Sequence, residues 1–131
     1  MQADISRSDW FQQARTLSTP EISDALDFFN LPGSALGIRP VAGPAKLFGL
    51  AFTIRFAPID RFAPGTVGDY IEDLEPGTVP VLDNGGRLDC TVWGGILSRL
   101  AAQKGLAGTV IHGVCRDTAE ADAAGYPLYA N

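Results

Sequence analysis

Hydrophobic residues recur at the spacing of an α-helix in two segments of the chain. The apolar positions of the first segment are Ile22, Ala25, Leu26 and Phe29. They follow Thr19-Pro20-Glu21, in which an N-cap threonine, a proline and an acid are typical of a helix start. The apolar positions of the second segment are Trp93, Ile96, Leu97, Leu100 and Ala101. The two patterns predict helices over 19–29 and 94–104, and Gly105 provides the C-terminal stop of the second helix.

Shorter apolar runs predict four strands. Between residues 46 and 57 the apolar positions alternate with Ala51, Thr53 and Arg55, so Arg55 is expected to point away from the core. Runs at 79–82, 107–112 and 125–130 are also predicted to be strands, and Pro80 should limit pairing on one side of the first. We expect loops at 31–45 and 58–68, one helical turn at 70–74, a hairpin-type turn at 83–86 and a short helix ending at 124.

Strands and helices alternate through the second half of the chain. This order predicts an α/β fold in which parallel strands are joined by right-handed crossovers. A chain of 131 residues suffices for one modest domain and not for two. We therefore expect a single domain over residues 1–131, with residues 1–17 as a lead-in helix.

Composition excludes several classes of function. The net charge is −5 and no run of like charges exceeds two residues, which argues against a nucleic-acid or anionic membrane surface. No apolar stretch approaches the roughly 20 residues of a membrane helix. The start of the chain is polar, and Cys90 and Cys115 are the only cysteines. These features favour a reducing, cytoplasmic setting with both thiols free.

Two dipeptides carry the candidate chemistry. Gly94-Gly95 opens the second helix and Arg116-Asp117 follows the strand at 107–112, and ligands of open α/β folds bind where strands end and helices begin. The glycines allow a carboxylate to approach the backbone N–H groups of the helix start, although they also allow tight helix–sheet packing.

Arg116 can bind a carboxylate or stabilise an enolate oxygen, and Asp117 can hold a hard divalent cation. Other interpretations of this dipeptide remain open. Asp117 and Glu120 have the spacing of a capping box, and Arg116 can pair with a surface acid.

Several stretches resemble the RraA-like family. They are Gly65-Thr-Val-Gly-Asp-Tyr70, the segment 81–97 with Trp93-Gly-Gly-Ile-Leu97, the segment 105–117 with Cys115-Arg-Asp117, and Gly125-Tyr-Pro-Leu-Tyr129. The resemblance covers residues 17–130. That family includes 4-hydroxy-4-methyl-2-oxoglutarate aldolases, which also decarboxylate oxaloacetate, and regulators of ribonuclease E activity.

The resemblance implies an α/β fold of the swivelling β/β/α type, assembled as homotrimers or hexamers. It also implies a divalent metal, Mg²⁺ or Mn²⁺, and a small 2-oxo acid substrate of the pyruvate or oxaloacetate type. Arg116 and Asp117 match the second half of the family's catalytic motif, which is an Asp, twenty residues, then Arg-Asp. Asp117 would anchor the metal, largely through waters, and Arg116 would stabilise the pyruvate enolate.

The same resemblance assigns substrate binding to the start of the second helix. The substrate carboxylate would be received by backbone N–H groups at Gly95, Ile96 and Leu97, with Gly94 beside them. The expected reaction is therefore metal-dependent cleavage of 2-oxo acids, by retro-aldol cleavage, by decarboxylation, or by both.

Two features depart from the family pattern. Gly95 stands where the first Asp of the motif is expected, and that acid orients metal-bound water for retro-aldol cleavage. Because loss of a positioned acid–base group typically costs ~10²–10⁴-fold in rate, we expect oxaloacetate decarboxylation to be favoured over aldol cleavage. The chain also ends where family members continue with further strands, which predicts a C-terminally shortened fold with an open sheet edge. A non-catalytic regulatory module and a degenerate fragment are the alternatives.

Overall fold

The computed structural model describes residue 5 and residues 7–131, and its contacts divide the chain into two compact units, one up to Leu36 and one from Gly37. The first unit contains α2 (Asp9–Ala14) and α3 (Thr19–Phe28). Ser18 caps α3, because its hydroxyl accepts the Glu21 N–H and the Glu21 carboxylate accepts the Ser18 N–H. The N-cap is therefore Ser18 rather than the predicted Thr19.

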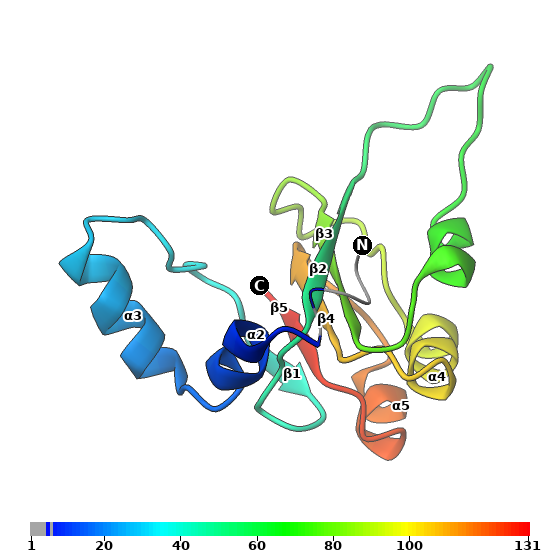
Figure 1. Cartoon of the computed structure of the whole chain (residues 1–131). Helices are drawn as coiled ribbons and strands as arrows, with labels where there is room; N and C mark the ends of the chain where they lie inside the picture. The colour runs from blue at the N-terminus through cyan, green and yellow to red at the C-terminus, as the bar shows by residue number, and fades with distance from the viewer. Residues whose placement is uncertain (1–4, 6) are drawn as a thin grey trace. The chain divides into compact units, whose positions relative to one another are not determined.

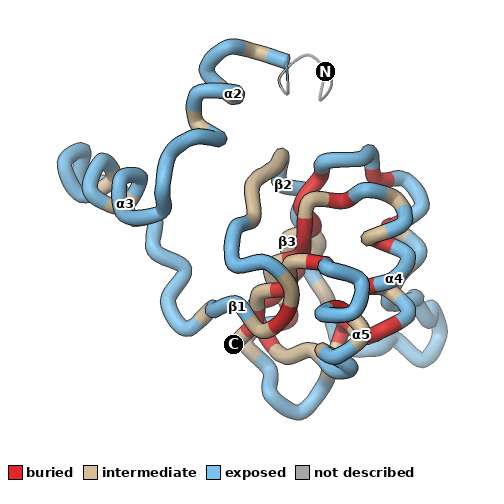
Figure 2. Tube along the Cα trace, turned by 90° about the horizontal axis from the view of Figure 1, so that it is seen from below, coloured by how far each residue is buried: buried red, intermediate tan, exposed pale blue. Residues whose placement is uncertain are grey.

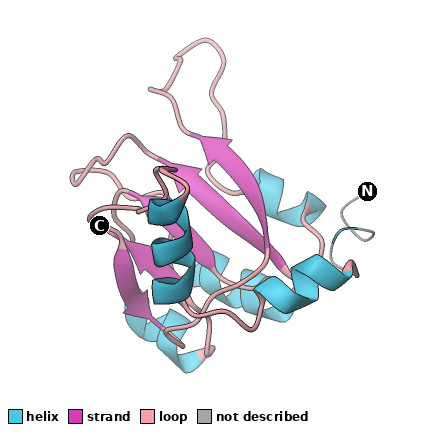
Figure 3. Ribbon diagram, turned by 60° about the vertical axis from the view of Figure 1, so that its left-hand side comes forward, coloured by secondary structure: helices cyan, strands magenta, loops and turns pink. Residues whose placement is uncertain are grey.

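The second unit is built on a twisted sheet (Figure 3). The sheet has five strands in the order β1-β5-β4-β3-β2. The strands are β1 (Arg39–Ala42), β2 (Leu50–Arg55), β3 (Thr78–Asp83), β4 (Thr109–His112) and β5 (Leu128–Ala130). Strands β2 to β5 are parallel, and β1 joins β5 in the antiparallel sense. This topology confirms the predicted α/β class.

The parallel strands are connected by short helices (Figure 1). The 3₁₀ helix η1 (Asp69–Asp73) precedes β3, α4 (Gly95–Gln103) joins β3 to β4, and α5 (Thr118–Ala123) joins β4 to β5. Strand β3 pairs with β2 along its whole length, but with β4 only from Val81 onward. The missing N–H of Pro80 was expected to limit pairing in this way.

Two turn and strand predictions are corrected. Residues 83–86 do not form a hairpin, because β3 runs parallel to β4. Gly85 and Gly86 instead have φ angles of 64° and 68° and lead into the loop before α4. Strand β1 lies inside the segment predicted as loop, and its Pro40 suits its position at the sheet edge.

The buried side of α4 also differs from the prediction. Ile96 is 75% exposed, whereas Ser98 and Ala101 are fully buried. The helical period was correct, but the face against the sheet is rotated toward small residues, which allow close packing of helix on strand.

The core lies between the sheet and the helices α4 and α5. Leu82, Ile111 and Leu128 are fully buried on β3, β4 and β5, and buried residues gather on β3 and on the two helices (Figure 2). Trp93 stacks on Tyr126 with ring centroids 6.1 Å apart. This packing fixes the segment immediately before α4, where Gly94 and Gly95 follow.

A buried hydrogen bond holds Trp93 in place, and its removal is the first testable prediction. Trp93 Nε1 donates to Ser98 Oγ at 2.9 Å. Because an unpaired buried donor costs about 1–3 kcal/mol, Ser98→Ala should lower the free energy of unfolding by that amount in a urea titration. Gln103→Ala, at an exposed position of the same helix, should change it by less than about 0.5 kcal/mol. Equal effects of the two variants would contradict this account.

No helix in the described part of the chain is long and apolar enough to cross a membrane. Cys90 and Cys115 are both free thiols, as predicted, and burial raises the pKa of the Cys115 thiol. Most of the polar start of the chain, and with it the beginning of the predicted lead-in helix, lies outside the described residues.

Candidate functional site

The loops that follow β3 and β4 bring the two dipeptides together. Thr91 and Val114 form a parallel bridge between these loops, and the Arg116 N–H donates to the Trp93 carbonyl at 3.1 Å. Helix α4 begins at Gly95 directly afterwards, and α5 begins at Thr118. Gly94-Gly95 and Arg116-Asp117 therefore lie side by side, at the ends of neighbouring parallel strands.

The Asp117 side chain is directed at the start of α4. Its Oδ2 accepts the Gly95 N–H at 3.2 Å and lies 3.4 Å from Arg116 Nε. Asp117 has a φ of 57°, a left-handed conformation that Asp and Asn adopt more readily than most residues, and it makes no side-chain cap to α5. The capping box with Glu120 is therefore absent, and the Asp117 carboxylate is 45% exposed.

Because Gly94 and Gly95 have no side chains, side chains from the segment 116–120 come close to the start of α4. A Cβ at Gly94 would lie 3.0 Å from Asp117 Oδ2 and 3.2 Å from Arg116 Nε. A Cβ at Gly95 would lie 2.4 Å from Glu120 Cδ and 2.5 and 2.7 Å from its two carboxylate oxygens. The two glycines thus leave space for the charged side chains of Arg116, Asp117 and Glu120. Helix–sheet packing alone does not require this space.

First-turn N–H groups of α4 are available for an anion. Gly95, Ile96 and Leu97 occupy the first turn, where N–H groups have no acceptor within the helix. The Gly95 N–H already donates to Asp117, whereas no acceptor is found for Ile96 and Leu97 among the described residues. The backbone of Ile96 and Leu97 is therefore the better placed part of the predicted carboxylate cradle.

These residues line an open cleft of about 620 Å³. The lining includes all six site residues predicted from the sequence: Gly94, Gly95, Ile96, Leu97, Arg116 and Asp117. Its charged side chains are Arg99, Arg116, Asp117 and Glu120, and Arg99 Nη1 lies 2.9 Å from Glu120 Oε2.

Sequence reasoning assigned Arg99 and Glu120 no part in the site. The signal for Arg99 was its position four residues after Gly95, which places it on the same face of α4. Glu120 stands one turn beyond Asp117, and its place in the cleft shows only in the structure, where it lies against Gly95 and pairs with Arg99.

The residues present fit a magnesium-type ion rather than a closed metal cage. Within the described residues, no group of three or more His, Cys, Asp or Glu side chains could hold a metal ion. Asp117 offers one accessible carboxylate beside an open cleft. Mg²⁺ is commonly held by one or two carboxylates with waters and substrate oxygens completing its shell, whereas structural zinc requires four protein ligands. Asp117 is therefore the residue that would hold Mg²⁺ or Mn²⁺.

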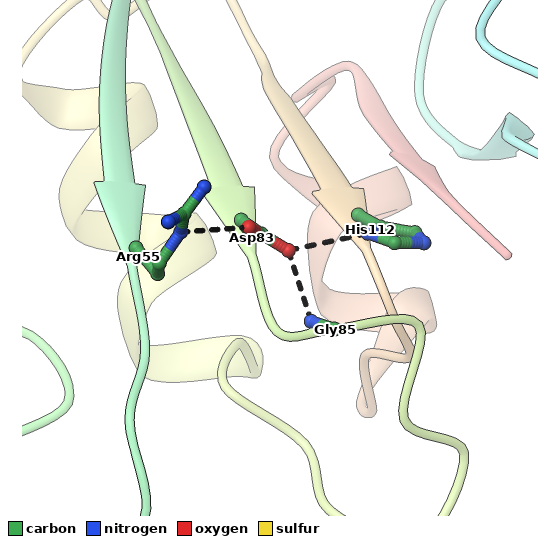
Figure 4. Close-up of polar contacts among 4 residues, drawn as sticks. All are labelled: Arg55, Asp83, Gly85 and His112. Carbon is green, nitrogen blue, oxygen red and sulfur yellow. Dashed lines mark hydrogen bonds and ion pairs between the residues drawn. The ribbon is translucent and has the colours of Figure 1, made fainter.

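A second charged cluster lies at the ends of β2, β3 and β4 (Figure 4). The Asp83 carboxylate accepts from Arg55 Nε at 3.1 Å and from the Gly85 N–H at 3.0 Å, and it lies 3.2 Å from His112 Nδ1. Because side chains alternate along a strand and Leu82 is buried against the helices, Asp83 faces away from them. None of these four residues lines the cleft, and they connect three strand ends.

This cluster gives a pH-dependent prediction. The Gly85 N–H, His112 and Arg55 lower the pKa of Asp83 from its ordinary value of 3.8. A carboxyl with a lower pKa in the folded state stabilises the fold above that ordinary value, and this stabilisation is lost as pH falls through the folded pKa. The Tm of Asp83→Asn should therefore be below that of the wild type near neutral pH, and the difference should shrink below about pH 4. Asp73→Asn, outside the cluster, should show no such convergence in the same melting series.

Residues 19–131 match the RraA-like family model, described as Aldolase/RraA. The chain belongs to the RraA-like family. Over 82 residues this RraA-like chain is 48% identical to the 4-hydroxy-4-methyl-2-oxoglutarate aldolase of Thermus thermophilus. The aligned region covers 63% of this chain and 48% of that protein.

Two further relatives show the range of the family. The chain is 36% identical over 120 residues to protein DlpA of Legionella pneumophila, covering 90% of this chain and 20% of that protein. The structure of the RNA-processing inhibitor RraA from Thermus thermophilus superposes with a TM-score of 0.67 at 30% identity, covering 82% of this chain and 64% of that one. The chain thus spans between a fifth and about half of the curated relatives named here. The superposition confirms the RraA-like α/β fold.

Proposed function

We propose that this RraA-like chain carries a divalent-metal-dependent lyase site for small 2-oxo acids. The reactions are decarboxylation of oxaloacetate and retro-aldol cleavage of substrates of the 4-hydroxy-4-methyl-2-oxoglutarate type. The observation that supports this proposal is the pairing of Asp117 and Arg116 beside the first turn of α4, in one open cleft. The aldolase name of the Thermus thermophilus relative supports the reaction class.

Five residues of the cleft would have parts in this reaction. Asp117 would hold Mg²⁺ or Mn²⁺, and the cation, when bound, stabilises the negative charge that develops on the substrate's keto oxygen. The N–H groups of Ile96 and Leu97 bind the carboxylate next to the keto group. Arg116 donates to the enolate oxygen as the carbon–carbon bond breaks and its electron pair moves toward the carbonyl. Gly94 leaves the space in which Arg116 and Asp117 approach α4.

A binding experiment tests the site independently of turnover. Oxalate resembles the planar enolate of pyruvate, so it should bind in a calorimetric titration when Mg²⁺ is present and not when Mg²⁺ is removed with a chelator. Mg²⁺-supplemented assays on oxaloacetate and on 4-hydroxy-4-methyl-2-oxoglutarate then measure the two reactions. Absence of a calorimetric response to Mg²⁺ with oxalate would rule out the lyase site.

A non-catalytic regulatory module is the second candidate. Gly95 leaves the start of α4 without an acid of its own, and one structural relative is an RNA-processing inhibitor. This candidate predicts a cooperatively folded protein that binds neither Mg²⁺ nor oxalate, so the same titration separates the two functions.

We also propose that the chain assembles as a homotrimer or homohexamer. Ile96 and Val67 are exposed apolar residues in the lining of the cleft, and Leu88 is exposed on the loop before α4. Apolar side chains grouped around a site are typical of a surface that another subunit covers. Light scattering coupled to size-exclusion chromatography measures the mass, and a monomer at micromolar concentration would contradict this proposal.

A further inference from the structure

Arg99 brings a second guanidinium to the cleft from a different element than Arg116. It projects from the second turn of α4, whereas Arg116 lies in the loop before α5. The Arg99 side chain is 60% exposed, and its Nη1 lies 2.9 Å from Glu120 Oε2. The absence of a side chain at Gly95 gives the Glu120 carboxylate its place, since a Cβ there would lie 2.4 Å from Glu120 Cδ. Three residues on two helices thus fix one guanidinium at the wall of the cleft.

Fold stability does not account for this arrangement. Because the Arg99 and Glu120 side chains are 60% and 44% exposed, water and salt screen their ion pair, which contributes little to stability. Glu120 Oε2 is buried, yet it has no hydrogen-bond donor within the described residues, so the ion pair with Arg99 is not an aligned hydrogen bond. A guanidinium carries five N–H donors in a planar fork, and most of those of Arg99 remain for another acceptor in the cleft.

The charge of the cleft indicates what that acceptor is. Arg99 and Arg116 together balance Asp117 and Glu120, so the four charged side chains of the lining sum to zero. A divalent cation held by Asp117 would bring the local charge to +2. A doubly charged dicarboxylate matches this charge, whereas a monocarboxylate leaves one positive charge uncompensated.

We propose that Arg99, positioned by Glu120, binds the distal carboxylate of a dicarboxylic 2-oxo acid. The inference rests on the proposed lyase function and adds to it a specificity-determining residue. Arg116 and the first turn of α4 hold the 2-oxo end of the substrate, on which the enolate forms. Arg99, one turn further along α4, holds the carboxylate at the other end, which in 4-hydroxy-4-methyl-2-oxoglutarate stays on the departing pyruvate and keeps its charge. Glu120 touches no substrate in this arrangement and acts only through Arg99.

Removal of the Arg99 charge should change substrate preference rather than chemistry. For Arg99→Gln, the KM for 4-hydroxy-4-methyl-2-oxoglutarate should rise roughly tenfold, which is the low end for loss of a hydrogen bond to a charged group at an exposed site. The kcat of this cleavage should change by less than about twofold, since the distal carboxylate keeps its charge and is bound equally in ground and transition states. The inhibition constant of 2-oxobutyrate, which lacks the distal carboxylate, should not change. Arg99→Lys should recover part of the lost affinity for 4-hydroxy-4-methyl-2-oxoglutarate.

A binding measurement gives a second readout that needs no turnover. In Mg²⁺-containing calorimetry, wild type should bind 2-oxoglutarate more tightly than 2-oxovalerate, a ligand of equal length without the distal carboxylate. Arg99→Gln should remove this preference, while Arg87→Gln, which breaks the exposed ion pair with Asp89 outside the cleft, should keep it. An Arg99→Gln variant that retains the preference, or that weakens both ligands equally, would overturn the assignment.

The part played by Glu120 is tested by a double-mutant cycle. Glu120→Gln should raise the KM for 4-hydroxy-4-methyl-2-oxoglutarate, as Arg99→Gln does, and the double variant should be no worse than Arg99→Gln alone. Additive effects would show that Glu120 acts independently of Arg99 and would contradict its positioning role. If wild type binds oxalate with Mg²⁺ but Arg99→Gln behaves as wild type, only this inference fails. If wild type binds none of these ligands, the lyase proposal fails with it.

Discussion

Asp117→Asn is expected to remove most of the Mg²⁺-dependent decarboxylation of oxaloacetate, lowering kcat/KM by roughly 10³-fold. This magnitude corresponds to the several kcal/mol of charge stabilisation that a bound cation supplies to a developing oxyanion. A neutral amide oxygen binds a hard cation more weakly than a carboxylate does, so the affinity for Mg²⁺ should fall together with the rate. Calorimetry with Mg²⁺ and oxalate, alongside the steady-state assay, measures both effects.

Asn is the appropriate substitution because Asp117 also has a structural part. Its φ of 57° is tolerated by Asn, and the amide oxygen can still accept the Gly95 N–H now held at 3.2 Å. The variant should therefore melt within a few degrees of wild type, whereas Asp117→Ala would combine loss of the cation with loss of this hydrogen bond. Asp73→Asn, outside the cleft, serves as the activity control. Unchanged decarboxylation in a folded Asp117→Asn protein would refute the assignment of Asp117.

The parts of the fold that sequence reasoning predicted well are those governed by local periodicity. Apolar runs placed β3, β4 and β5, and the 3.6-residue period placed α4. The rotation of α4 about its own axis could not be predicted from that period. Packing against the sheet buries Ser98 and leaves Ile96 exposed, although Ile96 is the more apolar residue. Strand β1 was missed because Pro40 and its glycine-rich surroundings suggest loop, and only pairing with β5 makes it a strand.

The candidate site divides in the same way. The dipeptides Gly94-Gly95 and Arg116-Asp117 were predictable as neighbours, since parallel strands end at one edge of a sheet. Arg99 and Glu120 were not, because their approach depends on side-chain contacts between two helices. The interpretation of Gly95 changes most. The sequence indicates a carboxylate-binding N–H group and a missing acid at this position, whereas the structure shows that the space beside Gly95 holds the Glu120 carboxylate.

Wild type is expected to decarboxylate oxaloacetate faster than it cleaves 4-hydroxy-4-methyl-2-oxoglutarate. Aldol cleavage must remove a hydroxyl proton, and a positioned base contributes typically ~10²–10⁴-fold to such a step, whereas decarboxylation removes no such proton. Position 95 carries no side chain, and the Glu120 carboxylate beside it is ion-paired with Arg99. Both reactions should be followed with one Mg²⁺-loaded preparation, and faster aldol cleavage would contradict this expectation.

An acid installed at position 95 should therefore raise aldol cleavage selectively. Gly95→Asp alone places a Cβ against Glu120, so it should be combined with Glu120→Ala, which clears the space. An acid also suits the first turn of α4, where it interacts favourably with the helix dipole. At saturating substrate, the double variant should raise the kcat of aldol cleavage by roughly 10²-fold and change that of decarboxylation by less than about threefold. The pair Gly95→Ala with Glu120→Ala is the matched control, because it adds the Cβ without the carboxylate. An equal gain in that control would show that space at the start of α4, and not an acid, limits aldol cleavage.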